Sequence, residues 1–331
     1  MLQYNSVHLK LFQMDGVARC TSGRCGIWIG SVAVYSFIPS PSSNELVLGP
    51  LRLHLYGLMI ALGVVAAVAL GRRRWAARGG DPEDVSAMAV WAVPAGLIGA
   101  RLYHVITDWP RLYSGGRWWP AAFEVWHGGL GIPGGVAAGA LAGIVYVRRR
   151  GLDLPRFMDA VAPGIPLAQA IGRLGNYFNQ ELFGRPSTLP WAVEIDRAHR
   201  IANTPDQSYW DYATFQPPFL YELLWNLAVV GVLVWMDRSR RLRPGKIFPA
   251  YVSLYFLGRM WVEELRSDTA ARIGGLRWNF LLSLIMIVVG AIWFFWGGCA
   301  ARPGDEFMLP TEAPLEDDPA DHADHADDAG V

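Results

Sequence analysis

Cysteines and charged residues are both scarce in this sequence. Of its 331 residues only three are cysteine, Cys20, Cys25 and Cys299, too few for the dense disulfide framework of small secreted domains. No histidine or further cysteine stands at zinc-binding spacing from this pair at 20 and 25. Charged residues make up 18% of the chain and hydrophobic residues 52%, whereas soluble domains average roughly 25% charged. These proportions exclude a disordered chain, a coiled coil and a generic nucleic-acid binder, and they favour a membrane protein.

Several catalytic motifs are also absent. The sequence has no G-x-S-x-G elbow, no H-E-x-x-H pair, no P-loop and no G-x-G-x-x-G after a strand. We therefore expect neither a metal nor a cofactor.

The formal net charge of zero conceals two opposite charges. Residues 301–331 hold ten acids and one base, a net charge of −9, and residues 1–300 hold 28 bases and 19 acids, a net charge of +9. The acidic tail contains proline and repeated Asp-His-Ala, cannot bury a core, and is predicted to be disordered.

Apolar runs recur along the rest of the chain. They predict membrane spans at 53–70, 86–106, 128–147, 157–171, 219–236, 247–262 and 279–296. The fourth is short and is interrupted by Pro163 and Pro166. Such a break is tolerated only where the backbone is buried in protein or lines a cavity. The predicted fold is therefore an all-α polytopic integral membrane protein with about seven transmembrane helices.

The short loops predict the orientation of these spans. Arginines cluster at 72–74, 148–150 and 238–243, after the first, third and fifth spans, whereas the loop after the second span holds only Arg111 and Arg117. By the positive-inside rule the odd-numbered spans end in the cytoplasm, so the N-terminus lies outside and the acidic tail inside. The three predicted regions are an N-terminal extension at 1–47, a catalytic domain at 48–300 with a small extracytoplasmic head at 172–217, and the tail at 301–331.

The extension fits this scheme poorly. Its apolar stretch at 27–38 is too short to span, and its basic residues are not arranged as in a signal peptide. One hypothesis is that the true start lies at Val32 or Val34, and N-terminal sequencing of the native protein would test it.

The richest polar segment is GRLGNYFNQELFGR at 172–185. It follows the proline-broken span and carries Arg173, Asn176, Asn179, Glu181 and Arg185. Two guanidinium groups beside backbone donors at a membrane boundary suit an anionic head group, because arginine presents planar donors to phosphate oxygens. The alternative is a loop cap whose arginines extend outward to the interface.

The sixth span adds charged residues inside the membrane. Tyr255, Arg259, Glu263 and Arg266 are spaced four, four and three apart, so on a helix they share one face. A charge at the bilayer centre costs about 2.5–3.5 kcal/mol on insertion scales, so such residues normally face a polar interior. Glu263 neutralises one arginine and leaves a net positive stripe; a purely structural ion pair is the alternative.

Other spans carry polar residues of the same kinds. Together they predict a polar cavity where the spans converge, while the Gly-rich third span favours close helix packing. The residues are His54, Tyr56, Arg101, Asp159, Tyr221 and Glu222.

These motifs resemble the bacterial prolipoprotein diacylglyceryl transferases. The matching blocks, in family order over roughly residues 48–298, are LHLYGLM, GARLYHV, WHGGLGIPGG, GRLGNYFNQELFGR, PPFLYE and GRMWVEELR. The resemblance implies a seven-helix plasma-membrane enzyme with an extracytoplasmic head. Its implied partners are phosphatidylglycerol, the lipid bilayer and prolipoprotein signal peptides. The diacylglyceryl group would pass to the lipobox cysteine as a thioether, with release of glycerol phosphate.

The resemblance also assigns residues. The positions that match family functional residues are Tyr56, Arg173, Asn176, Glu181, Gly184, Arg259 and Glu263. Further candidates for phosphatidylglycerol binding are Arg101, Glu222, Tyr255 and Arg266.

The chain departs from the family at two positions. Pro133 stands where many members have a histidine assigned as the catalytic base, and Gln216 replaces another common histidine. About 3% of a free thiol is already thiolate at pH 7, so full deprotonation contributes at most roughly 2 kcal/mol. We therefore expect electrostatic and positional catalysis, with Arg173 and Arg259 on the phosphate. His104 and His127 are the remaining candidate bases.

Two other functions stay open from the sequence. A non-catalytic lipid or lipoprotein chaperone is favoured by Pro133 and Gln216. A small-anion transporter would need internal inverted repeats, and none is visible.

Overall fold

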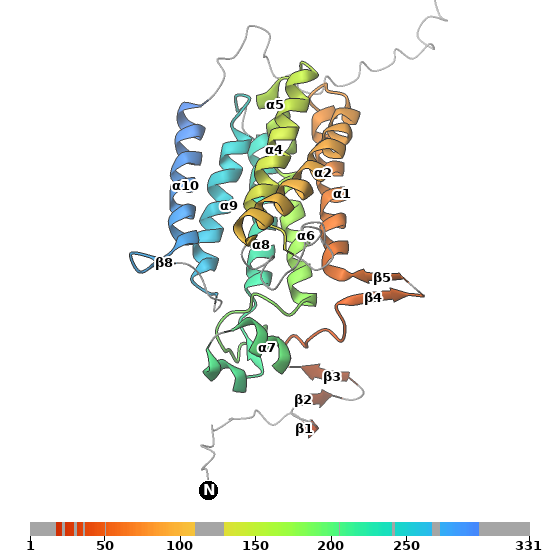
Figure 1. Ribbon diagram of the computed structural model, residues 1–331, viewed down its shortest axis with the longest axis vertical. Helices are drawn as coiled ribbons and strands as arrows, with labels where there is room; N and C mark the ends of the chain where they lie inside the picture. The colour runs from red at the N-terminus through yellow and green to blue at the C-terminus, as the bar shows by residue number, and fades with distance from the viewer. Residues whose placement is uncertain are drawn as a thin grey trace, which may run out of the picture.

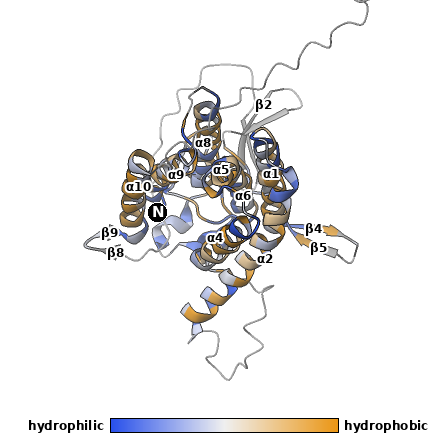
Figure 2. Ribbon diagram, turned by 90° about the horizontal axis from the view of Figure 1, so that it is seen from above, coloured by the Kyte–Doolittle hydropathy of each residue, from blue (hydrophilic) through white to orange (hydrophobic). Residues whose placement is uncertain are grey.

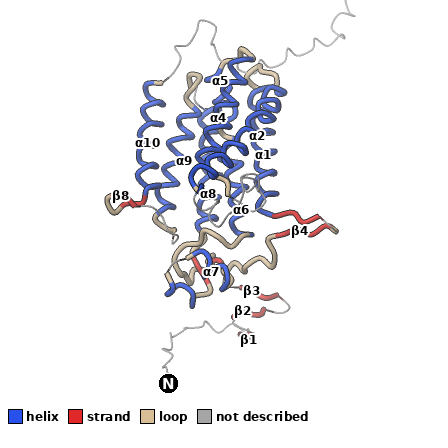
Figure 3. The backbone as a smooth tube through the Cα atoms, viewed as in Figure 1, coloured by secondary structure: helices blue, strands red, loops and turns tan. Residues whose placement is uncertain are grey.

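Helices dominate this chain, and the strands are short. The computed structural model describes residues 18–21, 24–29, 32–35, 37–49, 51–109, 129–204, 206–239, 242–266 and 272–297. Long helices run side by side as one bundle (Figures 1 and 3). They are α1 Leu55–Ala76, α2 Pro82–Thr107, α4 Ile132–Arg149, α5 Leu154–Val161, α6 Gly164–Phe178, α8 Pro218–Ser239, α9 Ile247–Glu263 and α10 Trp278–Trp296.

These helices coincide with the apolar runs of the sequence. Four of them, α1, α2, α8 and α10, are long and apolar enough to cross a membrane. Large apolar side chains on their outer faces are exposed, among them Val65, Val90, Ile98 and Phe295, and apolar residues mark α2 and α10 in Figure 2. Because water-soluble proteins rarely expose apolar surface on this scale, the bundle is that of a membrane protein.

The predicted interruption of the fourth span is confirmed. α5 ends at Val161 and α6 begins at Gly164, with Pro163 at the junction. Proline lacks the backbone N–H that would continue the helix. After the break, α6 packs tightly on α1, since a Cβ on Gly164 would lie 2.8 Å from the Ala67 carbonyl oxygen.

The helices are arranged around an interior rather than stacked in layers. Neighbouring helices follow the order α4, α2, α1, α6, α8, α9 and α10, and α5 contacts α1, α4 and α9. The view from above shows this succession (Figure 2). The helices that carry the polar motifs, α1, α6, α8 and α9, are therefore consecutive neighbours.

At the end of the bundle near α5, charged residues tie four helices together. Arg74 of α1 donates to the Asp159 and Ala160 carbonyls and pairs with Asp237 of α8 at 3.1 Å. The Asp159 carboxylate accepts hydrogen bonds from the backbone N–H groups that begin α9, at Gly245, Lys246 and Phe248 (2.7, 3.2 and 3.0 Å). Asp159, which the sequence grouped with the polar residues of the cavity, thus joins α5 to α9 instead.

The opposite end carries a small irregular segment between α6 and α8 (Figure 1). It contains β6 Val193–Glu194, α7 Arg197–Asn203, the 3₁₀ helix η3 Gln207–Asp211 and β7 Thr214–Phe215, and β6 pairs antiparallel with β7. Phe183, Val193, Ile195, Phe215 and Phe219 form its core.

Short strands also precede α1. β1 Ala18–Thr21, β2 Arg24–Ile29 and β3 Val32–Tyr35 pair antiparallel, and the hairpin of β4 Glu45–Leu48 and β5 Leu51–His54 projects beside the start of α1 (Figure 1). Ile38 bridges Val193 in parallel, and the Tyr177 hydroxyl donates to the Pro39 carbonyl at 2.8 Å. Part of the predicted extension therefore packs on the segment between α6 and α8.

Candidate functional site

The first half of the GRLGNYFNQELFGR motif is helical. The polar loop predicted from residue 172 begins later, because α6 continues to Phe178 and is capped at Asn179. Arg173 and Asn176 are three residues apart, so they lie on one face of α6. The Arg173 Nη1 donates to the Asn176 Oδ1 at 3.3 Å. The helix thus presents a guanidinium and an amide together.

The turn after α6 holds Glu181 in a strained backbone. Its neighbours Gln180 and Leu182 have φ of 49° and 58°, the left-handed region that costs non-glycine residues roughly 1–3 kcal/mol. The buried Gln180 amide exchanges two hydrogen bonds with Asp196, both at 2.7 Å. Glu181 Oε1 then accepts from Asn176 at 2.9 Å and from Asn179 at 3.3 Å. Neither Gln180 nor Asp196 was singled out from the sequence.

Tyr56 reaches this cluster from the first turn of α1. A Cβ on Gly175 would lie 2.5 Å from the Tyr56 Cδ2, so the ring lies directly against α6 where that helix has no side chain. The phenol interacts electrostatically with Glu181 and Arg173. The structure thus brings Tyr56, Arg173, Asn176 and Glu181 together, as the sequence predicted.

Glu222 of α8 connects this cluster to α9. It forms an ion pair with Arg173, and its Oε1 accepts from the Arg259 Nη1 at 2.8 Å. The Arg259 Nη2 donates in turn to the Glu263 Oε2 at 2.8 Å. One buried carboxylate therefore holds the two arginines that were predicted to bind phosphate.

The helical stripe predicted on the sixth span is only partly correct. Tyr255, Arg259 and Glu263 lie on α9, but α9 ends at Glu263, so the prediction is wrong for Arg266. Arg266 lies beyond the helix, in an isolated bridge with Gly184.

The positive charge predicted for the stripe meets carboxylates from other elements of the fold. Three guanidinium groups pair directly with the carboxylates of Glu222 and Glu263, and Glu181 joins them through Asn176. α8 and the turn after α6 thus supply acids that the stripe alone does not contain. The members of this network are Arg173, Arg259, Arg277, Glu181, Glu222 and Glu263.

Two members of the network were missed by the sequence analysis. The Arg277 Nε and the Asn279 Nδ2 donate to the Glu263 Oε1 at 2.9 and 3.1 Å. Both residues lie at the start of the last helix, where an arginine is typical of the end of a membrane span. Their position directly before an apolar run was the only feature of the sequence that could have indicated a role in the site.

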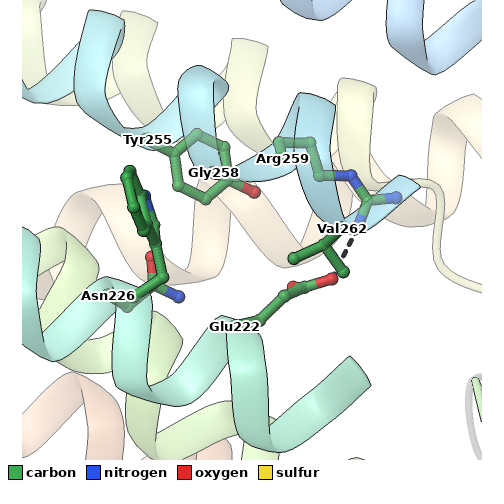
Figure 4. A pocket seen from close by; sticks show the side chains of 7 residues that line it. Glu222, Asn226, Tyr255, Gly258, Arg259 and Val262 are labelled. Carbon is green, nitrogen blue, oxygen red and sulfur yellow. Dashed lines mark hydrogen bonds and ion pairs between the residues drawn. The ribbon is translucent and has the colours of Figure 1, made fainter. Parts of the chain in front are cut away.

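A small hollow lies between α8 and α9 beside these ion pairs. It is partly open, its cavity volume is only about 10 Å³, and polar and apolar side chains line it. Tyr255 and Arg259 project from α9 toward Glu222 and Asn226 of α8 (Figure 4). A Cβ on Gly258 would lie 2.1 Å from the Trp225 Nε1, so this glycine allows α8 and α9 to approach.

Gly184 lies where three chain segments meet. Its N–H donates to the Gln216 carbonyl at 2.9 Å, and a Cβ would lie 2.8 Å from the Leu265 carbonyl oxygen. Gln216, which replaces a histidine of the family, binds this turn through its backbone. Gly184 thus joins these segments by a hydrogen bond and by close packing, and its part in substrate binding stays a prediction.

Arg101 and His104 lie on α2. The Arg101 Nη1 donates to the Gly129 carbonyl at 2.9 Å, and the His104 Nδ1 pairs with the Asp108 Oδ2 at 3.2 Å. Gly129 has φ of 80°, and a Cβ there would lie 2.2 Å from the His104 Nε2. His127 lies outside the described residues, and Pro133 lies in the first turn of α4.

Comparisons with known proteins agree on one family. The model of the family described as prolipoprotein diacylglyceryl transferase matches residues 45–296. The chain is 49% identical to phosphatidylglycerol–prolipoprotein diacylglyceryl transferase 1 of Streptomyces coelicolor, over 83% of this chain and 77% of that protein. It is 47% identical to the enzyme of the same name from Rhodococcus jostii (83% and 78%) and 51% identical to that from Frankia alni (84% and 71%).

The matched region contains α1 to α10 and with them every residue of the ionic network. Helical bundle, ionic site and sequence relatives therefore agree, and the chain belongs to the prolipoprotein diacylglyceryl transferase family.

Proposed function

We propose that this chain is the enzyme that transfers the diacylglyceryl group of phosphatidylglycerol to the lipobox cysteine of prolipoprotein signal peptides. One observation carries the proposal: Glu222 holds two arginines from different helices, Arg173 and Arg259, in a membrane-type bundle. Relatives about half identical over most of the chain bear the name of this activity.

The reaction explains the need for arginines. The cysteine sulfur forms a bond to the terminal glyceryl carbon while the bond from that carbon to the phosphate oxygen breaks. The electron pair stays on this oxygen, so glycerol phosphate leaves with an added negative charge, and the thiol proton passes to a base or to water. Fixed donors aimed at developing charge are the usual way to stabilise such a transition state.

Arg173 and Arg259 keep donors for this oxygen even while they are paired. Each guanidinium has five N–H groups, and the contacts to Glu222, Glu263 and Asn176 occupy only some of them. Asn176 would orient the glycerol head group, and Tyr56 would shape the site against Gly175. Glu181 and Glu263 would fix the polar side chains.

The reaction also needs an acceptor for the thiol proton. Pro133 and Gln216 cannot accept the thiol proton. His104 and His127 are the candidate acceptors, and the contact of His104 with Asp108 would orient its ring and leave Nε2 as the acceptor.

We also propose the membrane topology. The chain crosses the membrane seven times if the four long helices α1, α2, α8 and α10 each cross once, α4 and α9 each cross once, and α5 and α6 together make one crossing. The arginines in the last turns of α1, α4 and α8 lie at the α5 end and would face the cytoplasm. The head segment and the N-terminus would then be extracytoplasmic, and the tail cytoplasmic, in a bacterial plasma membrane. Exposed tryptophans near both ends of α8–α10, Trp235, Trp261, Trp278 and Trp296, suit the two interfaces.

A direct assay tests the activity. The purified full-length protein is incubated with phosphatidylglycerol labelled in its acyl chains and a lipobox peptide, and the peptide is analysed by mass spectrometry. The expected product carries one diacylglyceryl group on cysteine. Binding of lipid and peptide without any transfer would instead support the chaperone.

The role of Arg259 gives a sharper prediction. Arg259→Lys keeps the charge but loses the planar fork that contacts both Glu222 and Glu263, so transferase activity should fall about 100-fold or more. Lysine presents its donors from a single nitrogen and cannot reproduce this geometry. Activity of the Lys variant equal to wild type would falsify the bidentate role.

A further inference from the structure

Glu263 is the most completely enclosed charged side chain of the site. Its exposure is 0%, and it is the last residue of α9. A buried carboxylate is tolerated only when opposite charges and hydrogen bonds compensate for its lost hydration. Arg259 satisfies only Oε2, so the other oxygen needs partners from elsewhere in the fold.

Arg277 supplies the second charge. Its Nε lies 2.9 Å from the Glu263 Oε1, and its side chain is 10% exposed. Its Nη1 also donates to the Arg266 carbonyl at 3.2 Å. One guanidinium thus holds both the Glu263 carboxylate and the chain that leaves α9, and Asn279 adds a donor to the same Oε1 at 3.1 Å.

The local fold places Arg277 for this contact. It ends β9, Leu276–Arg277, which pairs with β8, Arg272–Ile273, and it caps α10. Gly274 and Gly275 form the two-residue turn with φ of 58° and 85°, values that glycine adopts without strain. The hairpin thereby returns the chain to the end of α9 before α10 begins.

We propose that Arg277 is a positioning residue of the transfer reaction, which fixes the Glu263 carboxylate so that Glu263 orients the guanidinium of Arg259. Arg259 is held between two carboxylates, Glu222 and Glu263, and each of these is held by another arginine, Arg173 or Arg277. Among the residues that the structure describes, removing Arg277 leaves Arg259 as the one cation paired with Glu263, and the carboxylate and Arg259 then move relative to Glu222. The inference rests on the proposed function, in which Arg259 binds the lipid phosphate.

Steady-state kinetics of the purified full-length protein test this role. Arg277→Met should raise KM for phosphatidylglycerol and lower kcat/KM for this lipid by about 10- to 100-fold, the cost of a displaced positioning group. KM for the lipobox peptide should not change. Arg277→Lys should recover part of the loss, because it restores the charge beside Glu263 but not both contacts.

A matched control separates positioning from general damage. Arg72→Met removes another paired guanidinium, which contacts Glu83 at 2.6 Å near the α5 end, and it should leave kcat and both KM values as in the wild type. Loss of folded enzyme alone would lower the apparent kcat without raising KM for the lipid. If Arg277→Met does not accumulate in membranes, Asn279→Ala removes a donor to the same oxygen and should show the same rise in KM on a smaller scale.

The outcomes distinguish the two proposals. An unchanged KM for phosphatidylglycerol in Arg277→Met, or in Asn279→Ala when the first variant does not accumulate, overturns the positioning role. Absence of transfer by the wild type overturns the proposed function itself.

Discussion

Each of two buried glutamates, Glu222 and Glu263, contacts two arginines. Glu222 holds Arg173 and Arg259, and Glu263 holds Arg259 and Arg277. Because Arg173 and Arg259 are fixed by ion pairs, their guanidinium groups point in set directions before substrate arrives. Preorganised donors of this kind need no reorientation during the reaction, whereas water molecules must reorient around the developing charge, so fixed donors stabilise the transition state better.

At the same scale, two glycines of the GRLGN motif should differ. Gly175→Ala places a methyl group 2.5 Å from the Tyr56 Cδ2, whereas a Cβ on Gly172 meets nothing within 4 Å. We expect Gly175→Ala to displace Tyr56 and reduce transfer at least about 10-fold, as a 1 Å misplacement can do. Gly172→Ala should be tolerated. The labelled-lipid assay on both variants checks this, and equal activities would contradict the Tyr56 contact.

Among the elements, α2 and α4 pack through facing glycines. A Cβ on Gly99 would lie 2.5 Å from the Gly134 carbonyl oxygen, and one on Gly134 would lie 2.3 Å from the Gly99 carbonyl oxygen. This confirms the packing role expected for the Gly-rich third span. Close backbone approach through small residues is the characteristic contact of membrane helices, which gain little from hydrophobic burial against one another.

This contact predicts a large difference between two helical glycines. Gly99→Ala overpacks the α2–α4 contact and should cost about 1–3 kcal/mol. Gly231→Ala in α8 meets nothing within 4 Å and should be neutral or gain about 0.5–1 kcal/mol of helix stability. Thermal unfolding of both variants in detergent measures the difference. A similar Tm for the two would contradict the close approach of α2 and α4.

On the scale of the whole molecule, the two ends of the bundle differ in charge and in structure. The end near α5 carries the arginine clusters in the last turns of α1 and α4, together with the ion pairs of Arg74 and Arg78 with Asp237. The other end carries the segment from β6 to β7 and the hairpin of β4 and β5 (Figure 1). The network from Arg173 to Arg277 lies toward this second end, because it uses the end of α6, the start of α8 and the end of α9.

The proposed orientation can be tested by labelling. In a variant without native cysteines, Asn203→Cys in α7 and Arg243→Cys before α9 each place a thiol at an exposed position. A membrane-impermeant maleimide should label position 203 in intact cells and position 243 only after permeabilisation, because the head would face outward. The reverse pattern would invert the topology.

Particular residues show how far the sequence predicted the site. The structure brings together seven residues that were named from their motifs: Tyr56, Arg173, Asn176, Glu181, Glu222, Arg259 and Glu263. Arg277 and Asn279 were not, because the partner of a buried carboxylate depends on which distant segment folds back onto it. The prediction for Arg266 was wrong because helical spacing gives no sign that α9 stops at Glu263.

By itself, the sequence determined the apolar helices, the proline break between α5 and α6, and the residue types that favour an anionic lipid. These follow from local composition, which sets whether a segment suits a bilayer and where a helix must end. Only the tertiary structure decided which charges meet. Glu222 pairs with arginines 49 and 37 residues away in the chain, so Arg259 of the stripe expected on one helix is shared between carboxylates of two helices. The energy of a buried charge depends on its neighbours in space, and adjacency of α6, α8, α9 and α10 supplies them.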